Sequence, residues 1–184
     1  MIKLIFGPMY SGKTTELIRL LERAYIAGKK VIMLRPKIDT RGFLTHSKKD
    51  TSWLKEEFVD LATFDASEYD VIGVEEGQFH KGLKDFCVKY SLMGSSAMGR
   101  QVVVSALHAT SESEMFEEII ALIPYCEGII KLNAVCTECG SEEGNYTYFM
   151  AGNKIEKVAV GGADIYTALC GACYHAHLHQ GVKK

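Results

Sequence analysis

The sequence predicts an α/β protein, in which helices cover both faces of a parallel sheet and a small cysteine-rich sub-domain follows. Short apolar runs typical of buried strands alternate with helical patterns up to about residue 132. Beyond residue 134 the composition shifts to cysteine, glycine and tyrosine, and helical periodicity ends. We therefore expect a sheet domain over residues 1–134 and a sub-domain over residues 135–184.

The first elements are predicted by an apolar run, a helical pattern and a second apolar run. Residues 2–6 form a strand that ends at Gly7, and residues 14–27 place apolar side chains at helical spacing until Gly28. Residues 31–34 predict the second strand, which Pro36 ends. Residues 37–56 are polar and without periodicity, so we expect a long loop there.

The later elements follow the same grammar. Helical spacing over residues 83–90 predicts one helix, and Ser113 is a candidate N-cap for another that Pro124 closes. Three further strands are expected at residues 70–75, 101–106 and 128–132. In the cysteine-rich part, residues 146–149 and 155–160 suggest a hairpin. The alternating His175, His177 and His179 suggest a solvated tail, with a second metal site as the alternative.

Composition narrows the class of protein. The chain has 184 residues, of which 47% are hydrophobic and 24% charged, values that are ordinary for a globular domain and exclude a disordered or coiled-coil protein. The 21 Lys and Arg against 23 Asp and Glu give a net charge of −2, which argues against a dedicated nucleic-acid partner. With no signal-peptide pattern and no membrane-length apolar run, we expect a cytoplasmic protein without a membrane partner.

A glycine-rich loop lies between the first predicted strand and helix. Residues 7–14 read GPMYSGKT and match G-x-x-x-x-G-K-[ST], with Gly7, Pro8, Met9, Tyr10, Ser11, Gly12, Lys13 and Thr14 in order. Backbone N–H groups of such a loop wrap phosphates, Lys13 would reach the β- and γ-phosphates, and the Thr14 hydroxyl would bind Mg²⁺. An ordinary strand-to-helix turn is the alternative. The pattern in this context predicts a nucleoside triphosphate site.

Two carboxylates stand at the end of the third predicted strand. Glu75 and Glu76 occupy the place where such proteins hold the metal of the bound nucleotide. Because successive side chains alternate along a strand, one carboxylate can serve Mg²⁺ while the other takes a proton from a substrate hydroxyl. A solvated acidic turn is the alternative interpretation.

Four of the six cysteines form two C-x-x-C pairs, Cys136 with Cys139 and Cys170 with Cys173. Four thiolates suit a closed tetrahedral Zn²⁺ site of structural type. A redox role for one pair is the alternative, and Cys87 and Cys126 are expected to be packing residues.

The motifs GPMYSGKT, DTR at residues 39–41, EEGQF at 75–79, the two cysteine pairs and VGGADIY at 160–166 occur in this order. Together they resemble the zinc-containing thymidine kinases. The resemblance implies a RecA-like domain with a zinc-anchored ribbon, or lasso, and phosphorylation of the 5′-hydroxyl of thymidine or a related pyrimidine deoxynucleoside by ATP in nucleotide salvage. It further implies structural Zn²⁺, Mg²⁺ with ATP, and a homotetramer.

Residue by residue, the resemblance makes Glu76 the general base and Lys13 and Arg41 the catalytic cations. The ATP site would comprise residues 7–14 together with Asp39, Thr40, Arg41, Glu75, Glu76, Gly77 and Gln78. The positions that enclose the nucleoside are Met9, Phe79, Leu107, Ser111, Phe116, Thr147, Lys157, Val158, Ala159, Val160, Gly161 and Tyr166.

Three positions depart from the family pattern. The family usually has Asp in place of Glu75 and of His108, and an aromatic residue near the base in place of Ser111. A missing ring changes an apolar pocket, so the preferred base stays open. Two other functions also stay open. One is a P-loop ATPase that grips nucleic acid through its zinc ribbon, although residues 136–173 are acidic, and the other is an inactive nucleotide sensor.

Overall fold

The computed structural model describes residues 1–39, 50–93, 100–150 and 165–181, with side chains to residue 178. Its residues divide into two compact units. The first unit contains Met1–Phe6, Lys13–Ala106 and Glu117–Ile130, and the second contains Gly7–Gly12, Leu107–Phe116 and Lys131–Lys184.

A six-stranded sheet with the order β3-β2-β4-β5-β1-β6 forms the centre of the first unit. Strand β2 pairs in parallel with both β3 and β4, and β4 pairs in parallel with β5. The strands are β1 (Ile2–Gly7), β2 (Val31–Pro36), β3 (Glu56–Val59), β4 (Val71–Val74), β5 (Gln101–Leu107) and β6 (Gly128–Lys131). The predicted α/β class with a parallel sheet is confirmed.

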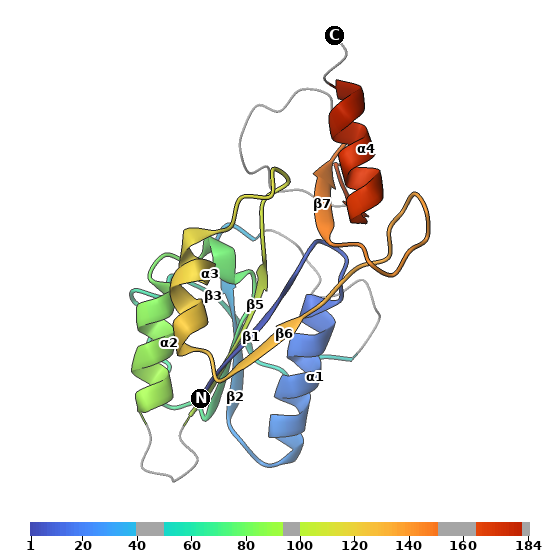
Figure 1. Cartoon of the computed structure of the whole chain (residues 1–184). Coiled ribbons are helices and arrows are strands. Elements are labelled where there is room, and N and C mark those ends of the chain that lie inside the picture. Colours follow the sequence, from blue (N-terminus) through green and yellow to red (C-terminus); the bar gives the residue numbers. More distant parts are fainter. Residues whose placement is uncertain (40–49, 94–99, 151–164, 182–184) are drawn as a thin grey trace. The chain divides into compact units, whose positions relative to one another are not determined.

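Helices cover both faces of this sheet. Figure 1 shows α1 (Lys13–Ile26) on one face and α2 (Leu83–Leu92) with α3 (Glu117–Leu122) on the other. A Cβ at Gly73 of β4 would lie 2.7 Å from Cδ1 of Leu21, so the missing side chain allows α1 to pack directly on the strand. The core lies in the two layers between the sheet and these helices.

The first unit differs from the sequence prediction at two places. Strand β3 begins where the long loop was expected to end, and the sequence analysis did not predict it. Its sequence EEFV, at the sheet edge, contains no apolar run of the kind that predicts a buried strand. Helix α3 begins at Glu117, and Ser113 does not cap it. Ser113 instead adopts φ 64° in a turn closed by the bridge between Ala109 and Met115.

The second unit contains β7 (Tyr146–Phe149), which pairs antiparallel with β8 (Tyr166–Leu169), and α4 (Gly171–Gly181). The expectation that helical structure ends before the cysteine-rich part is wrong, since His175 and His177 lie on α4, although His175 is exposed as a solvated histidine would be. This helix carries few apolar residues, so its sequence lacks the pattern that predicts a helix. The expected second hairpin strand, 155–160, lies outside the described residues. Along the described part of the chain, no helix combines the length and apolar character needed to cross a membrane.

Candidate functional site

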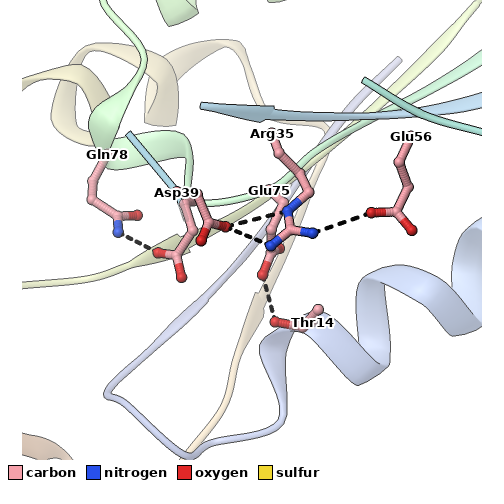
Figure 2. Close-up of polar contacts among 7 residues, drawn as sticks. Thr14, Arg35, Asp39, Glu56, Glu75 and Gln78 are labelled. Carbon is pink, nitrogen blue, oxygen red and sulfur yellow. Dashed lines mark hydrogen bonds and ion pairs between the residues drawn. The ribbon is translucent and has the colours of Figure 1, made fainter. Parts of the chain in front are cut away.

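The buried carboxylate of Glu75 lies at the end of β4, beside the first turn of α1. Its side chain accepts a hydrogen bond of 2.5 Å from the Thr14 hydroxyl, and the residue is 2% exposed (Figure 2). Thr14 is the second residue of α1, so the helix and β4 together place the two predicted Mg²⁺ ligands in contact. A hydroxyl and a carboxylate oxygen at this distance present hard oxygen donors of the kind that Mg²⁺ binds.

Glu76 follows in a backbone conformation that is unusual for a residue with a side chain. It has φ 52° and ψ 47°, in the left-handed region, directly before the 3₁₀ turn η1 (Gly77–Phe79). The amide of Gln78 donates a 2.5 Å hydrogen bond to its carboxylate. The sharp turn thus gives Glu75 and Glu76 different partners, and left-handed backbone of this kind clusters at functional sites.

Arg35 is a buried cation that the sequence analysis missed. Its guanidinium donates to Asp39 at 2.9 and 3.2 Å and to Glu56 at 3.2 Å (Figure 2). The side chains of Arg35 and Asp39 are 4% and 5% exposed, and the Phe58 ring lies 4.7 Å from the guanidinium carbon. An arginine between the apolar run of β2 and Pro36 was the signal in the sequence. One of its partners, Glu56, lies on β3, a strand that the sequence analysis did not predict.

Asp39, predicted to lie on the phosphate side, is therefore tied to β2 by this buried ion pair. Leu34 pairs with Val74 across the sheet, and the Glu75 N–H donates to the Leu34 carbonyl at 2.9 Å. Arg35 and Glu75 are thus the next residues on neighbouring parallel strands. The first unit gathers Thr14, Asp39, Glu75, Glu76 and Gln78 at the same end of its sheet, where strand ends of α/β proteins bind ligands.

His80 is a buried residue that directly follows η1, the turn after the two glutamates. It is 4% exposed, and its Nε2 has no hydrogen-bond partner among the described residues. Burial lowers the pKa of His80 to about 4, although a hydrogen bond to the backbone of Glu75 and the charges of Asp60 and Glu76 act in the opposite direction. The imidazole is therefore neutral at physiological pH.

In the second unit, the loop of residues 7–12 has the conformation of a tight backbone cradle. Tyr10 and Gly12 have φ of 63° and 80°, and the Ser11 hydroxyl donates to the Pro8 carbonyl at 2.8 Å. The Met9 N–H donates to the Thr147 hydroxyl at 3.0 Å. Strand β7 is thereby fastened to the loop, a connection that no spacing in the sequence reveals.

The predicted nucleoside positions are distributed over both units. Phe79 lies in η1 of the first unit, whereas the others that the structure describes belong to the second unit: Met9, Leu107, Ser111, Phe116, Thr147 and Tyr166. Thr147 and Tyr166 are 5% and 7% exposed, and the ring of Tyr166 meets that of Phe149 edge to face at 5.4 Å. Lys157, Val158, Ala159, Val160 and Gly161 lie outside the described residues, as do Thr40 and Arg41.

The four predicted metal-ligand cysteines converge in the second unit. All four sulfur atoms lie within 4.8 Å of one another, and those of Cys139 and Cys170 are 3.6 Å apart. Four thiolates around one Zn²⁺ at about 2.3 Å would be separated by about 3.8 Å, so the cluster fits a tetrahedral ion. Cys87 and Cys126 are not part of it.

The turn around Cys136 favours its thiolate. Burial raises the pKa of Cys136, but the backbone N–H groups of Cys139, Cys170 and Glu138 outweigh it and bring the pKa to about 6. Gly140 closes the turn with φ 74°, and its N–H donates to the Cys136 carbonyl at 2.9 Å. A metal ligand must be deprotonated, and Cys136 is favoured in that form, whereas hydrogen bonds with the neighbouring thiols raise the pKa of Cys139 and of Cys173.

Comparisons with known proteins cover nearly the whole chain. A family model described as thymidine kinase matches residues 1–174. Cytosolic thymidine kinase of Gallus gallus is 36% identical over 177 residues, which are 94% of this chain and 76% of the relative. Thymidine kinase 1 of Dictyostelium discoideum is 35% identical over 188 residues, 98% of this chain and 80% of the relative. Thymidine kinase of Variola virus is 36% identical over 176 residues, 94% and 96% of the two chains.

Proposed function

The chain belongs to the thymidine kinase family, and on this premise we propose that it transfers the γ-phosphoryl group of ATP to the 5′-hydroxyl of thymidine in nucleotide salvage. One observation carries the proposal. The family match covers residues 1–174, a range that includes the glycine-rich loop and all four cysteines of the cluster.

The phosphate-binding residues would act as in other P-loop enzymes. Backbone N–H groups of residues 7–12 hold the phosphates, and Lys13 with Arg41 balances the charge that develops on the transferred group. Thr14 and Glu75 would hold Mg²⁺, which would neutralise negative charge on the phosphates. The 2.5 Å contact between Thr14 and Glu75 supports this assignment.

Glu76 would be the general base. Its carboxylate accepts the proton of the 5′-hydroxyl while the oxygen of that hydroxyl forms a bond to the γ-phosphorus and the bond to ADP breaks. The half-buried position of Glu76 and its hydrogen bond from Gln78 support this role, because they hold one carboxylate oxygen in a defined place.

Structural Zn²⁺ would be held by Cys136, Cys139, Cys170 and Cys173, joining the two ends of the segment that contains β7 and β8. The predicted nucleoside residues Thr147 and Tyr166 lie on these strands.

The cytoplasmic location is supported by relatives named as cytosolic. The homotetramer is a proposal from the family resemblance, and sedimentation velocity of the purified chain tests it.

Glu76→Gln tests the catalytic assignment. The amide keeps the size of the side chain and cannot take a proton, so kcat should fall about 10²- to 10⁴-fold while ATP affinity stays as in the unaltered enzyme. A coupled ATP assay and a titration of Mg·ATP measure the two quantities. The roles are reversed if Glu75→Gln abolishes turnover and Glu76→Gln retains it.

The same assay separates the alternative functions. We expect turnover with thymidine, and a series with deoxyuridine, deoxycytidine and 5-substituted analogues determines the base preference. A nucleic-acid-dependent ATPase would instead hydrolyse ATP faster when single-stranded DNA is added. An inactive sensor would bind ATP and phosphorylate no nucleoside.

A further inference from the structure

The hydroxyl of Tyr174 connects the cysteine cluster to a distant loop of the second unit. Tyr174 follows Cys173 directly, and its hydroxyl donates to the Ser111 carbonyl at 2.9 Å. The same oxygen accepts a hydrogen bond of 3.3 Å from the Ser113 hydroxyl. Tyr174 is 4% exposed, so its hydroxyl is part of a buried side chain. Both hydrogen-bond partners belong to one loop, about sixty residues earlier in the sequence.

The ring that carries this hydroxyl is held on its other sides. It stacks on Tyr146 at 4.4 Å with 15° between the planes, and it meets the ring of Tyr148 edge to face at 6.2 Å. The Tyr174 N–H donates to the Cys170 carbonyl at 2.9 Å. Strand β7 and the second cysteine pair therefore fix where the hydroxyl points.

The loop that receives it depends on outside support. Ser113 has φ 64°, which costs free energy for a residue other than glycine. Inside the loop, the Ser113 N–H donates to the Thr110 carbonyl at 3.1 Å and the Thr110 N–H to the Glu114 carbonyl at 2.8 Å. Ser113 and Glu114 are exposed, so few apolar contacts stabilise the turn from its outer side.

We infer that Tyr174 is a positioning residue for nucleoside binding, which acts by holding the turn of residues 110–114 through its hydroxyl. This inference rests on the proposed function and on the prediction from the family resemblance that Ser111 lines the nucleoside site. It assigns to the metal-binding part of the chain a role beyond its own folding, because the residue next to Cys173 sets the backbone at Ser111.

Tyr174→Phe tests the inference, with Tyr148→Phe as the matched control. Both changes remove one hydroxyl from the same aromatic cluster, and the Tyr148 hydroxyl has no hydrogen bond among the described residues. For Tyr174→Phe we expect KM for thymidine to rise about five- to tenfold, the effect of losing one to two hydrogen bonds, with KM for ATP within about twofold. Zinc content should stay at that of the unaltered protein in both variants.

Ser113→Ala removes one partner while leaving Tyr174 in place. It should raise KM for thymidine in the same direction, and Tyr174→Phe combined with Ser113→Ala should fall short of the product of the two single effects. An equal rise of KM for thymidine and ATP in Tyr174→Phe, or no change in either single variant, would overturn the inference.

Hydrogen exchange separates this inference from the proposed function. Tyr174→Phe should speed exchange of the amides in residues 107–116, whereas Tyr148→Phe should not. If the unaltered protein phosphorylates no nucleoside, the proposed function fails, and faster exchange in Tyr174→Phe still supports the contact that holds the loop. If thymidine is phosphorylated and exchange is unchanged, the inference about Tyr174 fails alone.

Discussion

Arg35 illustrates how much a single buried charge depends on its partners. Its guanidinium satisfies Asp39 and Glu56, and both members of its pair with Asp39 are almost fully buried. Ions taken out of water lose their hydration, and only this geometry compensates the loss. Removing the cation would take away the two hydrogen bonds that the guanidinium donates to the buried Asp39 carboxylate.

Arg35→Met should therefore lower the free energy of unfolding by about 3–5 kcal/mol, the typical cost of breaking a buried ion pair. Urea denaturation measures it. Arg19→Met is the control, because Arg19 pairs with Glu16 at 2.6 Å on the exposed side of α1 and should leave the urea midpoint nearly unchanged. Equal losses in the two variants would contradict the buried role of Arg35.

His80 makes stability depend on pH. Burial keeps the pKa of His80 at about 4 in the folded protein, against 6.5 for an ordinary histidine. Between these values the unfolded chain binds a proton that the folded chain does not, so the free energy of unfolding falls as pH falls from 6.5 to 4. At pH values above 6.5 the contribution is fully present, because both states are then neutral.

His80→Asn removes the titration and keeps an amide donor for the backbone of Glu75. The difference in unfolding free energy between the unaltered protein and this variant should change by about 3 kcal/mol between pH 6.5 and 4, to the disadvantage of the unaltered protein. Urea titrations across this range measure it. Parallel stability curves for the two proteins would show that His80 is protonated as readily in the folded state as in the unfolded state, which would contradict the prediction.

At the scale of elements, helix α4 depends on what it contacts rather than on its own pattern. Leu169, Cys170 and Tyr174 form a small buried cluster with Cys136, and Tyr146 packs against it. A cluster of this size buries little apolar surface, so the cysteine site has to supply much of the stability. The pair of Glu138 with His177 adds one contact between the first cysteine turn and α4.

Removing the metal should therefore unfold this part of the chain. Cys136→Ser should release the zinc and speed hydrogen exchange in β7, β8 and α4, while the central sheet keeps its protection. Zinc analysis and exchange mass spectrometry measure the two effects. Cys126 is a half-buried cysteine outside the cluster, so Cys126→Ala should retain zinc. Loss of zinc from Cys126→Ala would contradict the four-cysteine assignment.

At the scale of the whole molecule, a net charge close to zero is consistent with a small charged ligand that is bound by a few residues of one site. The net charge is −2, so affinity for phosphates has to come from the glycine-rich loop and the cations next to it. Binding to the folded state alone raises stability by mass action.

Mg·ATP at about 100 times its Kd should raise the free energy of unfolding by about 2.7 kcal/mol. Lys13→Ala should lose most of this increase, because in the proposed function it removes the cation that faces the phosphates and leaves the loop backbone in place. Thermal unfolding with and without Mg·ATP measures it, with thymidine alone as the ligand control. An equal increase in Lys13→Ala would exclude Lys13 from the phosphate site.

Short stretches of sequence were sufficient to predict the fold class and the cysteine cluster, and to locate the glycine-rich loop and the two glutamates. Each depends on residue types at fixed local spacing: glycines and a lysine in one loop, carboxylates at a strand end, thiols in pairs. Apolar runs in the same way predicted the β1, β2, β4, β5 and β6 strands close to their observed bounds.

Tertiary structure alone decided the rest. Four contacts join segments distant in sequence: the pairing of β2 with β3, the ion pair of Arg35 with Glu56, the pairing of β7 with β8, and the contact of Tyr174 with residues 111 and 113. Which segments meet depends on sheet register and on burial, and these are set by the packing of the chain as a whole. The local pattern therefore specified the chemical groups of this thymidine kinase family member, and the packing selected the residues that hold those groups in place.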